Sequence, residues 1–174
     1  AEETLNLIQN LYEQKLTTYP RVDTTYLPND VYPKVPGILD KLKFYKRFTD
    51  KLKGKKIRKS KKVFDDKKVT DHHAIIPTGV SPSGISAQHQ KVYDLITKRF
   101  ISVFYPDCKV SNSTVLGFVK EVKFKATGKQ ILETGWRAVY ADIPSEEQSN
   151  QLQKEEQVMP VFAKGEKGPH TPDF

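Results

Sequence analysis

The chain has 174 residues and a formal net charge of +8, with 29 Lys and Arg against 21 Asp and Glu. This length allows one domain or two small ones, and no apolar run approaches the ~18 residues of a membrane helix. Cys108 is the only cysteine, which excludes an internal disulfide and a four-cysteine zinc site. We therefore expect a cytoplasmic protein with no membrane partner.

The first third of the chain predicts two helices joined by a proline-rich segment. Residues 4–16 place Leu5, Ile8 and Tyr12 on one helical stripe. This helix is already under way at the first residues, so we expect the chain to be a piece of a longer protein. The prolines between residues 20 and 36 predict extended or turning chain. Residues 37–54 predict a second helix that Gly54 ends.

The positive charge is concentrated in one segment. Residues 41–70 carry 14 Lys and Arg against 3 Asp, and the run KKIRKSKK carries six cations in eight residues. These cations are Lys55, Lys56, Arg58, Lys59, Lys61 and Lys62. Such a run suits a polyanion, because bound Lys and Arg release condensed counterions from phosphates. A solvated loop or an ordinary basic surface explains it as well.

The second half of the chain changes from helix to strand patterns. A third helix is predicted over residues 86–105, with Ser86 as its cap and Pro106 after its end. After Cys108, apolar and charged residues alternate through Val122, Phe124 and Ala126, which is typical of a strand.

Three further patterns complete the β-rich half. Thr127–Lys129 predicts a turn, GWRAVY (residues 135–140) a strand, and residues 158–168 the start of another. Residues 142–157 form a polar, acidic connector. The predicted fold is therefore α+β, with a mainly helical domain over 1–108 and a β-rich domain over 109–174.

DHHAIIPTG (residues 71–79) contains the adjacent His72 and His73. Adjacent histidines on a strand point to opposite faces, so the pair alone is a poor metal chelate. Asp71 is the only acid beside them, and a third ligand would have to come from elsewhere. The ordinary interpretation is that one histidine packs and the other is solvated, and we predict no metal site in this chain.

TTYPRVDTTYL (residues 17–27) places Tyr19 in a threonine-rich extended stretch, where a tyrosine is usually a half-buried strand residue. A tyrosine nucleophile has an ordinary pKa of about 10, so it needs nearby cations at neutral pH. In an extended chain Arg21 shares a face with Tyr19, and its guanidinium suits a phosphate. A histidine cation would add to this. The set is coherent for phosphodiester transesterification.

Two segments resemble the type IA DNA topoisomerases. LYEQKLTTYPRVDTTYL (residues 11–27) resembles their active-site pattern, roughly (S/T)YPRTDSxxL after a helix. VTDHHAIIPTG (residues 69–79) resembles the second signature of the bacterial topoisomerase III branch. The two occur in the family's order, and the likeness covers essentially the whole chain. The resemblance implies a helical gate domain over 1–108 and part of a β-rich hinge domain over 109–174.

The resemblance also implies roles for individual residues. Tyr19 would attack single-stranded DNA to form a 5′-phosphotyrosine link, without ATP. Arg21 would hold the scissile phosphate, and His72 would contact the DNA backbone, as would His73 with less support from the family pattern. The family's Mg²⁺ would bind an acidic domain that precedes this region, so the chain alone should be inactive. The resemblance further implies a monomeric fragment of a bacterial, nucleoid-associated enzyme.

One departure from the family pattern and two alternative functions remain. Val22 stands where the family has Thr or Ser, which predicts tuned activity with the nucleophile retained. One alternative is a non-catalytic nucleic-acid-binding module whose working surface is the basic run. The other is a relaxase-type tyrosine endonuclease, although those enzymes favour a His-apolar-His pair and this chain has DHHA.

Overall fold

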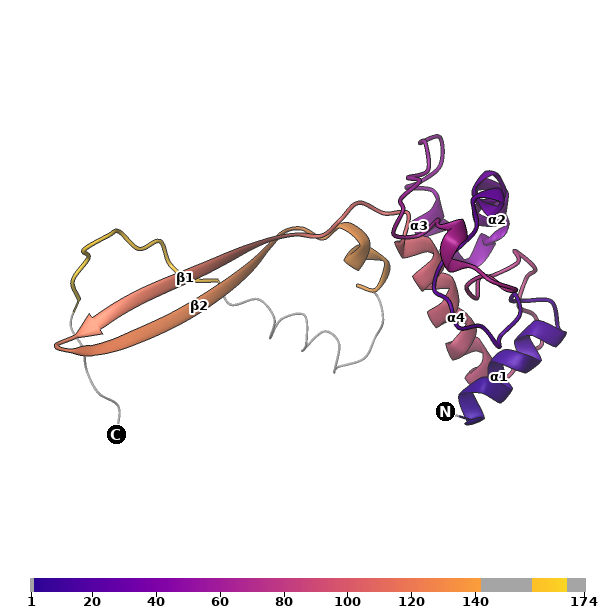
Figure 1. The fold of residues 1–174 in the computed structure, drawn as a ribbon, viewed down its shortest axis with the longest axis horizontal. Helices are drawn as coiled ribbons and strands as arrows, with labels where there is room; N and C mark the ends of the chain where they lie inside the picture. The colour runs from indigo at the N-terminus through magenta and orange to yellow at the C-terminus, as the bar shows by residue number, and fades with distance from the viewer. Residues whose placement is uncertain (1, 142–157, 169–174) are drawn as a thin grey trace. The chain divides into compact units, whose positions relative to one another are not determined.

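Figure 1 shows a computed structural model of the chain, which describes residues 2–141 and 158–168. The chain divides into two compact units, residues 1–106 and residues 107–174. The α-helices lie in the first unit and the two strands lie in the second. The fold is therefore α+β, and the change from helix to strand falls between the units.

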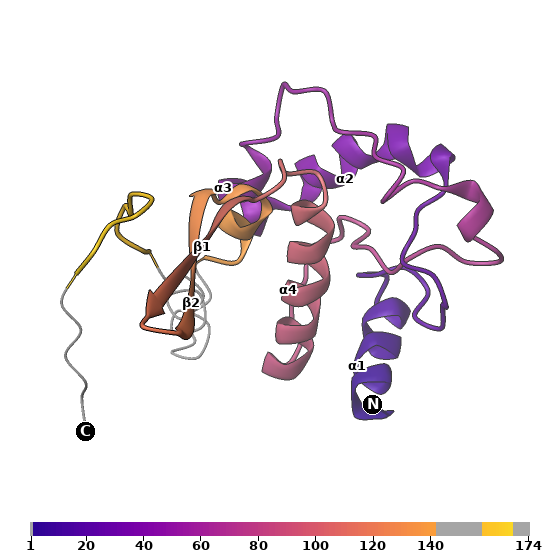
Figure 2. The ribbon, with the colours of Figure 1, turned by 60° about the vertical axis from the view of Figure 1, so that its left-hand side comes forward.

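Two helices, α1 (Glu2–Glu13) and α4 (Ala87–Ser102), pack against each other in the first unit (Figure 2). Leu11 of α1 and Tyr93 and Ile101 of α4 are fully buried. Burying side chains of this size stabilises the fold by about 1.5–3 kcal/mol each. The packed pair α1 and α4 contributes to the core of the first unit, and the segments between them in sequence are short helices and irregular chain.

The predicted cap of α4 agrees with the structure, whereas the predicted buried residues of α1 and α4 agree only in part. Ser86 caps α4 as predicted, because its hydroxyl oxygen accepts the backbone N–H of His89. On α1 the buried face centres on Leu11, whereas Tyr12, predicted on the buried stripe, is 39% exposed. On α4, the apolar spacing of Val92, Leu95 and Ile96 predicts that Leu95 is buried, whereas it is exposed. Hydrophobic spacing thus located both helices but not the centre of their buried faces.

Short helices connect α1 to α4. In chain order they are η1 (Asn29–Lys34), α2 (Val35–Lys41), η2 (Lys43–Tyr45), α3 (Lys46–Thr49) and η3 (Asp66–Lys68). The single helix predicted over 37–54 is wrong, because Leu42 has φ −77° and ψ 63° and ends α2. Buried residues recur every three positions at Leu39, Leu42, Tyr45 and Phe48. A straight α-helix would spread them over about half its circumference, whereas a 3₁₀ turn aligns them.

The second unit contains one antiparallel hairpin, β1 (Lys109–Val119) and β2 (Val122–Glu133). Val119 pairs with Val122, so the turn is Lys120–Glu121, and Lys120 has a left-handed φ of 54°. The turn predicted at Thr127–Lys129 is wrong, because these residues continue β2 and pair with β1. With the turn at Lys120–Glu121, β-branched residues pair across the strands, as in Thr114 with Thr127 and Val119 with Val122. The Thr-Gly sequence alone does not indicate this pairing.

Two other strand predictions in this unit fail. Residues 135–139 form a 3₁₀ helix, η4 (Gly135–Val139), which begins at a glycine with φ 51°. Trp136 packs edge-on to Tyr140, at 6.0 Å between ring centroids, and Val139 is fully buried, as a helical turn permits. Residues 158–168 are irregular with a turn and contain no strand. The acidic connector over 142–157 lies outside the described residues.

Candidate active site at the tyrosine loop

The chain just before Tyr19 is paired with a segment from beyond the basic run. Thr17 and Pro77 form an isolated antiparallel bridge. The backbone N–H of Thr18 donates to the carbonyl oxygen of Ile76 at 3.0 Å, and the N–H of Ile76 donates to the Thr18 hydroxyl oxygen at 2.9 Å. The Thr18 hydroxyl also donates to the carbonyl oxygen of Ala74 at 3.4 Å. Thr18 is therefore bonded to this segment through both its backbone and its side chain, which fixes the chain immediately before Tyr19.

The chain beyond Tyr19 is held at a second point. The Thr24 hydroxyl donates to the carbonyl oxygen of Lys68 at 2.6 Å, and the N–H of Leu27 donates to the carbonyl oxygen of Val63 at 2.8 Å. Residues 19–23, which we call the tyrosine loop, therefore span two anchored points. The sequence folds this way because threonines flank the loop and offer hydroxyls to backbone groups of other segments.

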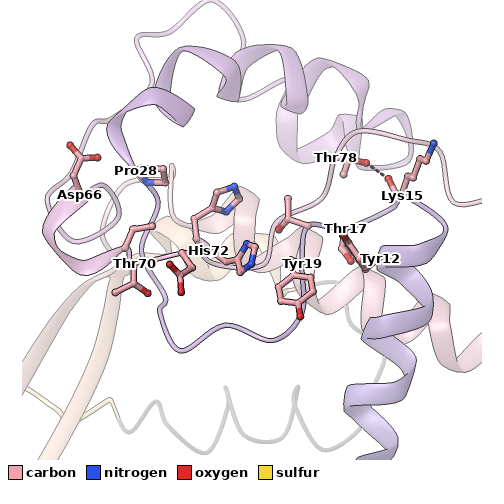
Figure 3. A pocket seen from close by; sticks show the side chains of 13 residues that line it. Tyr12, Lys15, Thr17, Tyr19, Pro28, Asp66, Thr70, His72 and Thr78 are labelled. Carbon is pink, nitrogen blue, oxygen red and sulfur yellow. Dashed lines mark hydrogen bonds between the residues drawn. The ribbon is translucent and has the colours of Figure 1, made fainter.

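The ring of Tyr19 lies between two other rings. The Tyr12 ring, at the end of α1, meets it edge-on, with 5.4 Å between centroids and 84° between planes. The His72 ring lies against it at 4.4 Å and 39°, and Figure 3 shows Tyr19 and His72 side by side. Aromatic contacts of this kind contribute about 0.5–1.5 kcal/mol each. Tyr19 is therefore positioned while its side chain stays partly exposed.

A cleft of about 610 Å³ runs along these residues. Figure 3 shows Lys15 at one end and Asp66 at the other, with Tyr19 and His72 between them. This volume falls within the range of about 300–1,000 Å³ that is typical of ligand pockets. The cleft is therefore large enough to receive part of a polymer such as a single nucleic-acid strand.

The two ends of the cleft carry opposite charges. At one end, the backbone N–H and the side-chain amide of Asn29 donate to the Asp66 carboxylate at 2.7 and 2.6 Å. These bonds, the side-chain amide first, lower the pKa of Asp66, and the nearby Lys59 lowers it further, so the Asp66 carboxylate is ionised at neutral pH. Lys15 supplies a cation at the other end.

The structure brings together two of the three residues predicted as catalytic. Tyr19 and His72 line the cleft, whereas Arg21 is exposed and does not line it. The predicted extended geometry does not hold, because the N–H of Val22 donates to the carbonyl oxygen of Pro20 at 3.2 Å. This three-residue turn, centred on Arg21, breaks the alternation that would put Tyr19 and Arg21 on one face.

His73 lines the same cleft as Tyr19, whereas the basic run does not. His73 lines the cleft, is half-buried, and its Nδ1 lies 2.8 Å from the carbonyl oxygen of Ala74. A carbonyl oxygen only accepts, so this nitrogen carries the proton. The six cations of the basic run are exposed and do not line the cleft. The run is tied to η1, because the Tyr32 hydroxyl donates to the carbonyl oxygen of Ile57 at 2.7 Å.

The DNA topoisomerase family matches residues 1–172 of the chain. The chain belongs to the DNA topoisomerase family. It is 39% identical over 171 residues to DNA topoisomerase 3 of Bacillus subtilis, 37% to that of Bacillus licheniformis, and 39% to that of Bacillus cereus. Each alignment covers 95% of this chain and 23% of the relative. The resemblance to type IA topoisomerases of the topoisomerase III kind is thus confirmed, and the chain spans about a quarter of these relatives' length.

Sequence reasoning missed three residues that line the cleft, namely Tyr12, Lys15 and Thr18. Tyr12 was predicted only as a helix residue, and Lys15 and Thr18 were given no role. Thr18 could have been found from the flanking threonines, which suggest side-chain bonds to backbone. Tyr12 carried a weaker signal, because a tyrosine on an apolar helix stripe usually belongs to the core.

The described residues of this topoisomerase chain do not fit a Mg²⁺ site. Within residues 2–141 and 158–168, no group of three His, Cys, Asp or Glu side chains could hold a metal ion. Asp66 at the cleft already accepts two hydrogen bonds from Asn29. Within the same residues, none of the helices has the length and apolar character to cross a membrane.

Proposed function

We propose that this chain is the tyrosine-bearing part of a type IA topoisomerase III, which cleaves and reseals one DNA strand to change DNA topology. The observation that supports this most is the placement of Tyr19. Its ring is positioned by Tyr12 and His72 at a cleft, next to a chain segment fixed by Thr18. The membership of the topoisomerase family supports the same reaction.

In the proposed reaction, the phenolic oxygen of Tyr19 attacks a phosphodiester of single-stranded DNA. A new O–P bond forms, and the bond from phosphorus to the 3′ oxygen breaks, so that the leaving strand ends in a 3′-hydroxyl. The phenolic proton passes to a base in the rest of the protein, and an acid there gives a proton to the leaving 3′ oxygen. The ester keeps the energy of the broken bond, so ATP is not needed. After another strand passes, the 3′-hydroxyl attacks the ester and regenerates Tyr19.

The neighbouring residues assist this chemistry in different places. His72, against the Tyr19 ring, meets the DNA backbone close to the attacking oxygen. Arg21 is exposed on the tyrosine loop, so it reaches the scissile phosphate from outside the cleft when DNA is bound. His73 lines the cleft and contacts the bound strand further along. Each of these groups provides donors that suit a phosphate.

The rest of the enzyme supplies what this chain does not. In the proposal, residues 1–108 form the gate that carries Tyr19, and residues 109–174 form part of the hinge. We propose that a further domain of the enzyme supplies Mg²⁺ and the proton acceptor. Within residues 2–141 and 158–168, no group of three potential ligands could hold the metal ion. The chain alone therefore acts as a monomer that binds single-stranded DNA without relaxing supercoiled DNA. The whole enzyme works at the bacterial nucleoid in the cytoplasm.

A second candidate function is a non-catalytic nucleic-acid-binding module. It is favoured by one observation, the exposure of all six cations in residues 55–62 away from the cleft. In that case charge reversal in the basic run would weaken DNA binding more than any change at Tyr19. The two functions differ in covalent chemistry, which only the topoisomerase proposal requires.

The polarity of the covalent link tests the proposal. The full-length protein is incubated with single-stranded oligonucleotides labelled at the 5′ or the 3′ end, then denatured and separated on a gel. We expect the 3′-labelled fragment to stay attached to protein and the 5′-labelled fragment to be released with a free 3′-hydroxyl. Attachment of the 5′-labelled fragment, or no attachment of either, would count against the proposal.

A further inference from the structure

Helix α1 ends in a motif that holds Lys15 in an uncommon backbone conformation. The N–H of Leu16 donates to the carbonyl oxygen of Leu11 at 2.9 Å, and the N–H of Lys15 donates to that of Tyr12 at 2.8 Å. Lys15 has a left-handed φ of 60°. This is the Schellman arrangement, in which the left-handed position is most often occupied by glycine.

Within residues 2–141 and 158–168, the Lys15 side chain takes part in no hydrogen bond or ion pair. The hydrophobic contact of the motif is provided by Leu11 and Leu16, which are both buried. Lys15 accepts a hydrogen bond from the Thr78 hydroxyl at 2.6 Å, but through its backbone carbonyl oxygen. A glycine would make the same bonds without the strain of a left-handed Cβ. The Lys15 side chain is exposed, and no contact within the described residues accounts for a lysine at this position.

The charged residues that line the cleft indicate which kind of ligand the Lys15 side chain would bind. Of the described residues that line the cleft, Lys15 is the only Lys or Arg, and the acids are Asp66 and Asp71. Figure 3 shows Lys15 and Asp66 at opposite ends, with Tyr19 between them. A polyanion is attracted to the Lys15 end and repelled from the Asp66 end.

We propose that Lys15 binds a backbone phosphate of the single DNA strand that occupies the cleft, on the α1 side of Tyr19. This inference rests on the proposed function and adds a binding residue to its site. A lysine suits the task because its ammonium is a compact cation on a flexible stem, which reaches a phosphate without exact geometry. The strain at Lys15 is then the cost of placing that cation at the end of α1.

The test compares stability and DNA binding in two variants, Lys15→Gly and Lys15→Gln. Binding of the chain to a fluorescent single-stranded oligonucleotide is followed by anisotropy over a series of NaCl concentrations. One lost phosphate contact lowers the slope of log K against log salt by about 0.7 and weakens binding roughly fivefold at about 0.1 M salt. Lys15→Gly also relieves the left-handed strain, so its Tm should rise by about 2 °C.

Lys120 offers a matched control, because it is another exposed lysine with a left-handed φ, in the hairpin turn. Lys120→Gly should raise Tm similarly and leave the affinity and the salt slope unchanged. The inference is overturned if both Lys15 variants bind like the unchanged chain, if Lys120→Gly weakens binding equally, or if the unchanged chain does not bind. These results concern non-covalent binding, whereas the proposed function fails separately, if the adduct forms without Tyr19.

Discussion

The ring of His72 lies against the ring of Tyr19, with 4.4 Å between their centroids. The two residues come from segments on either side of the basic run. The hydrogen bonds between Thr18 and Ile76 hold these segments together at a point adjacent to the ring contact. The position of the proposed nucleophile therefore depends on a threonine that has no role in the proposed chemistry.

Replacing Thr18 by valine should destabilise the fold and loosen this contact. The variant keeps the shape of the side chain but leaves the N–H of Ile76 without its acceptor, in a partly buried place. We expect a loss of about 1–2 kcal/mol in the free energy of unfolding, measured by urea denaturation. The matched control is Thr25→Val, at an exposed threonine in the same region, which should change that free energy by less than about 0.5 kcal/mol.

The same variant has a catalytic consequence. In the full-length protein, Thr18→Val should lower the yield of covalent DNA adduct more than Thr25→Val, because Tyr19 is no longer held next to His72. Equal stability and equal adduct yield in the two variants would show that the Thr18 bonds do not position the nucleophile.

Local patterns predicted much of the first unit, because helices depend on contacts close in sequence. The spacing of apolar residues located α1 and α4, and Ser86 marked the start of α4. The break at Leu42 could not be predicted, because it follows from burying four residues at a spacing of three against the rest of the unit. The hairpin turn at Lys120 was missed because Lys and Glu are not typical turn residues.

The identities of two site residues could be predicted from the sequence, whereas the arrangement of the other site residues could not. Tyr19 and His72 carry residue types that suit phosphate chemistry, and the two motifs pointed to them before any contact was known. The shared face of Tyr19 and Arg21 was predicted from strand geometry, and it failed because the chain turns at Arg21. Lys15 and Tyr12 gain their place in the cleft from the way α1 ends, which their own residue types do not reveal.

Stability should fall at alkaline pH because of buried tyrosines, chiefly Tyr45. Burial raises the pKa of Tyr45, and the neighbouring Asp94 carboxylate raises it further. Because the folded pKa lies above the unfolded value of about 10, this stabilisation is present below pH 10 and is lost as pH rises beyond it. Tyr45→Phe cannot ionise, so its Tm should decline less between pH 9 and 11 than that of the unchanged chain.

Burial also raises the pKa values of Tyr93 and Tyr105, so the Tyr45 variant should reduce the alkaline loss without removing it. The measurement is the Tm by circular dichroism at half-unit steps of pH. An identical decline in Tm for Tyr45→Phe and the unchanged chain would contradict this explanation.

The exposed basic run should contribute to DNA affinity without deciding where cleavage occurs. Changing Lys55, Lys56 and Lys61 together to Gln removes three exposed cations that do not line the cleft. If all three meet phosphates, the salt slope for single-stranded DNA should fall by about 2. In the full-length protein, the position of cleavage in a labelled oligonucleotide should stay the same. A slope identical to that of the unchanged chain would mean that the run is solvated and does not bind DNA.

In our proposal, Tyr19 forms the covalent bond with DNA. The most direct test is the covalent adduct of the full-length protein with labelled single-stranded DNA, separated on a denaturing gel. Tyr19→Phe should form no adduct yet bind DNA non-covalently as before, while Tyr140→Phe, a matched change in the second unit, should form it at the usual yield. An adduct that persists in Tyr19→Phe would show that another residue is the nucleophile.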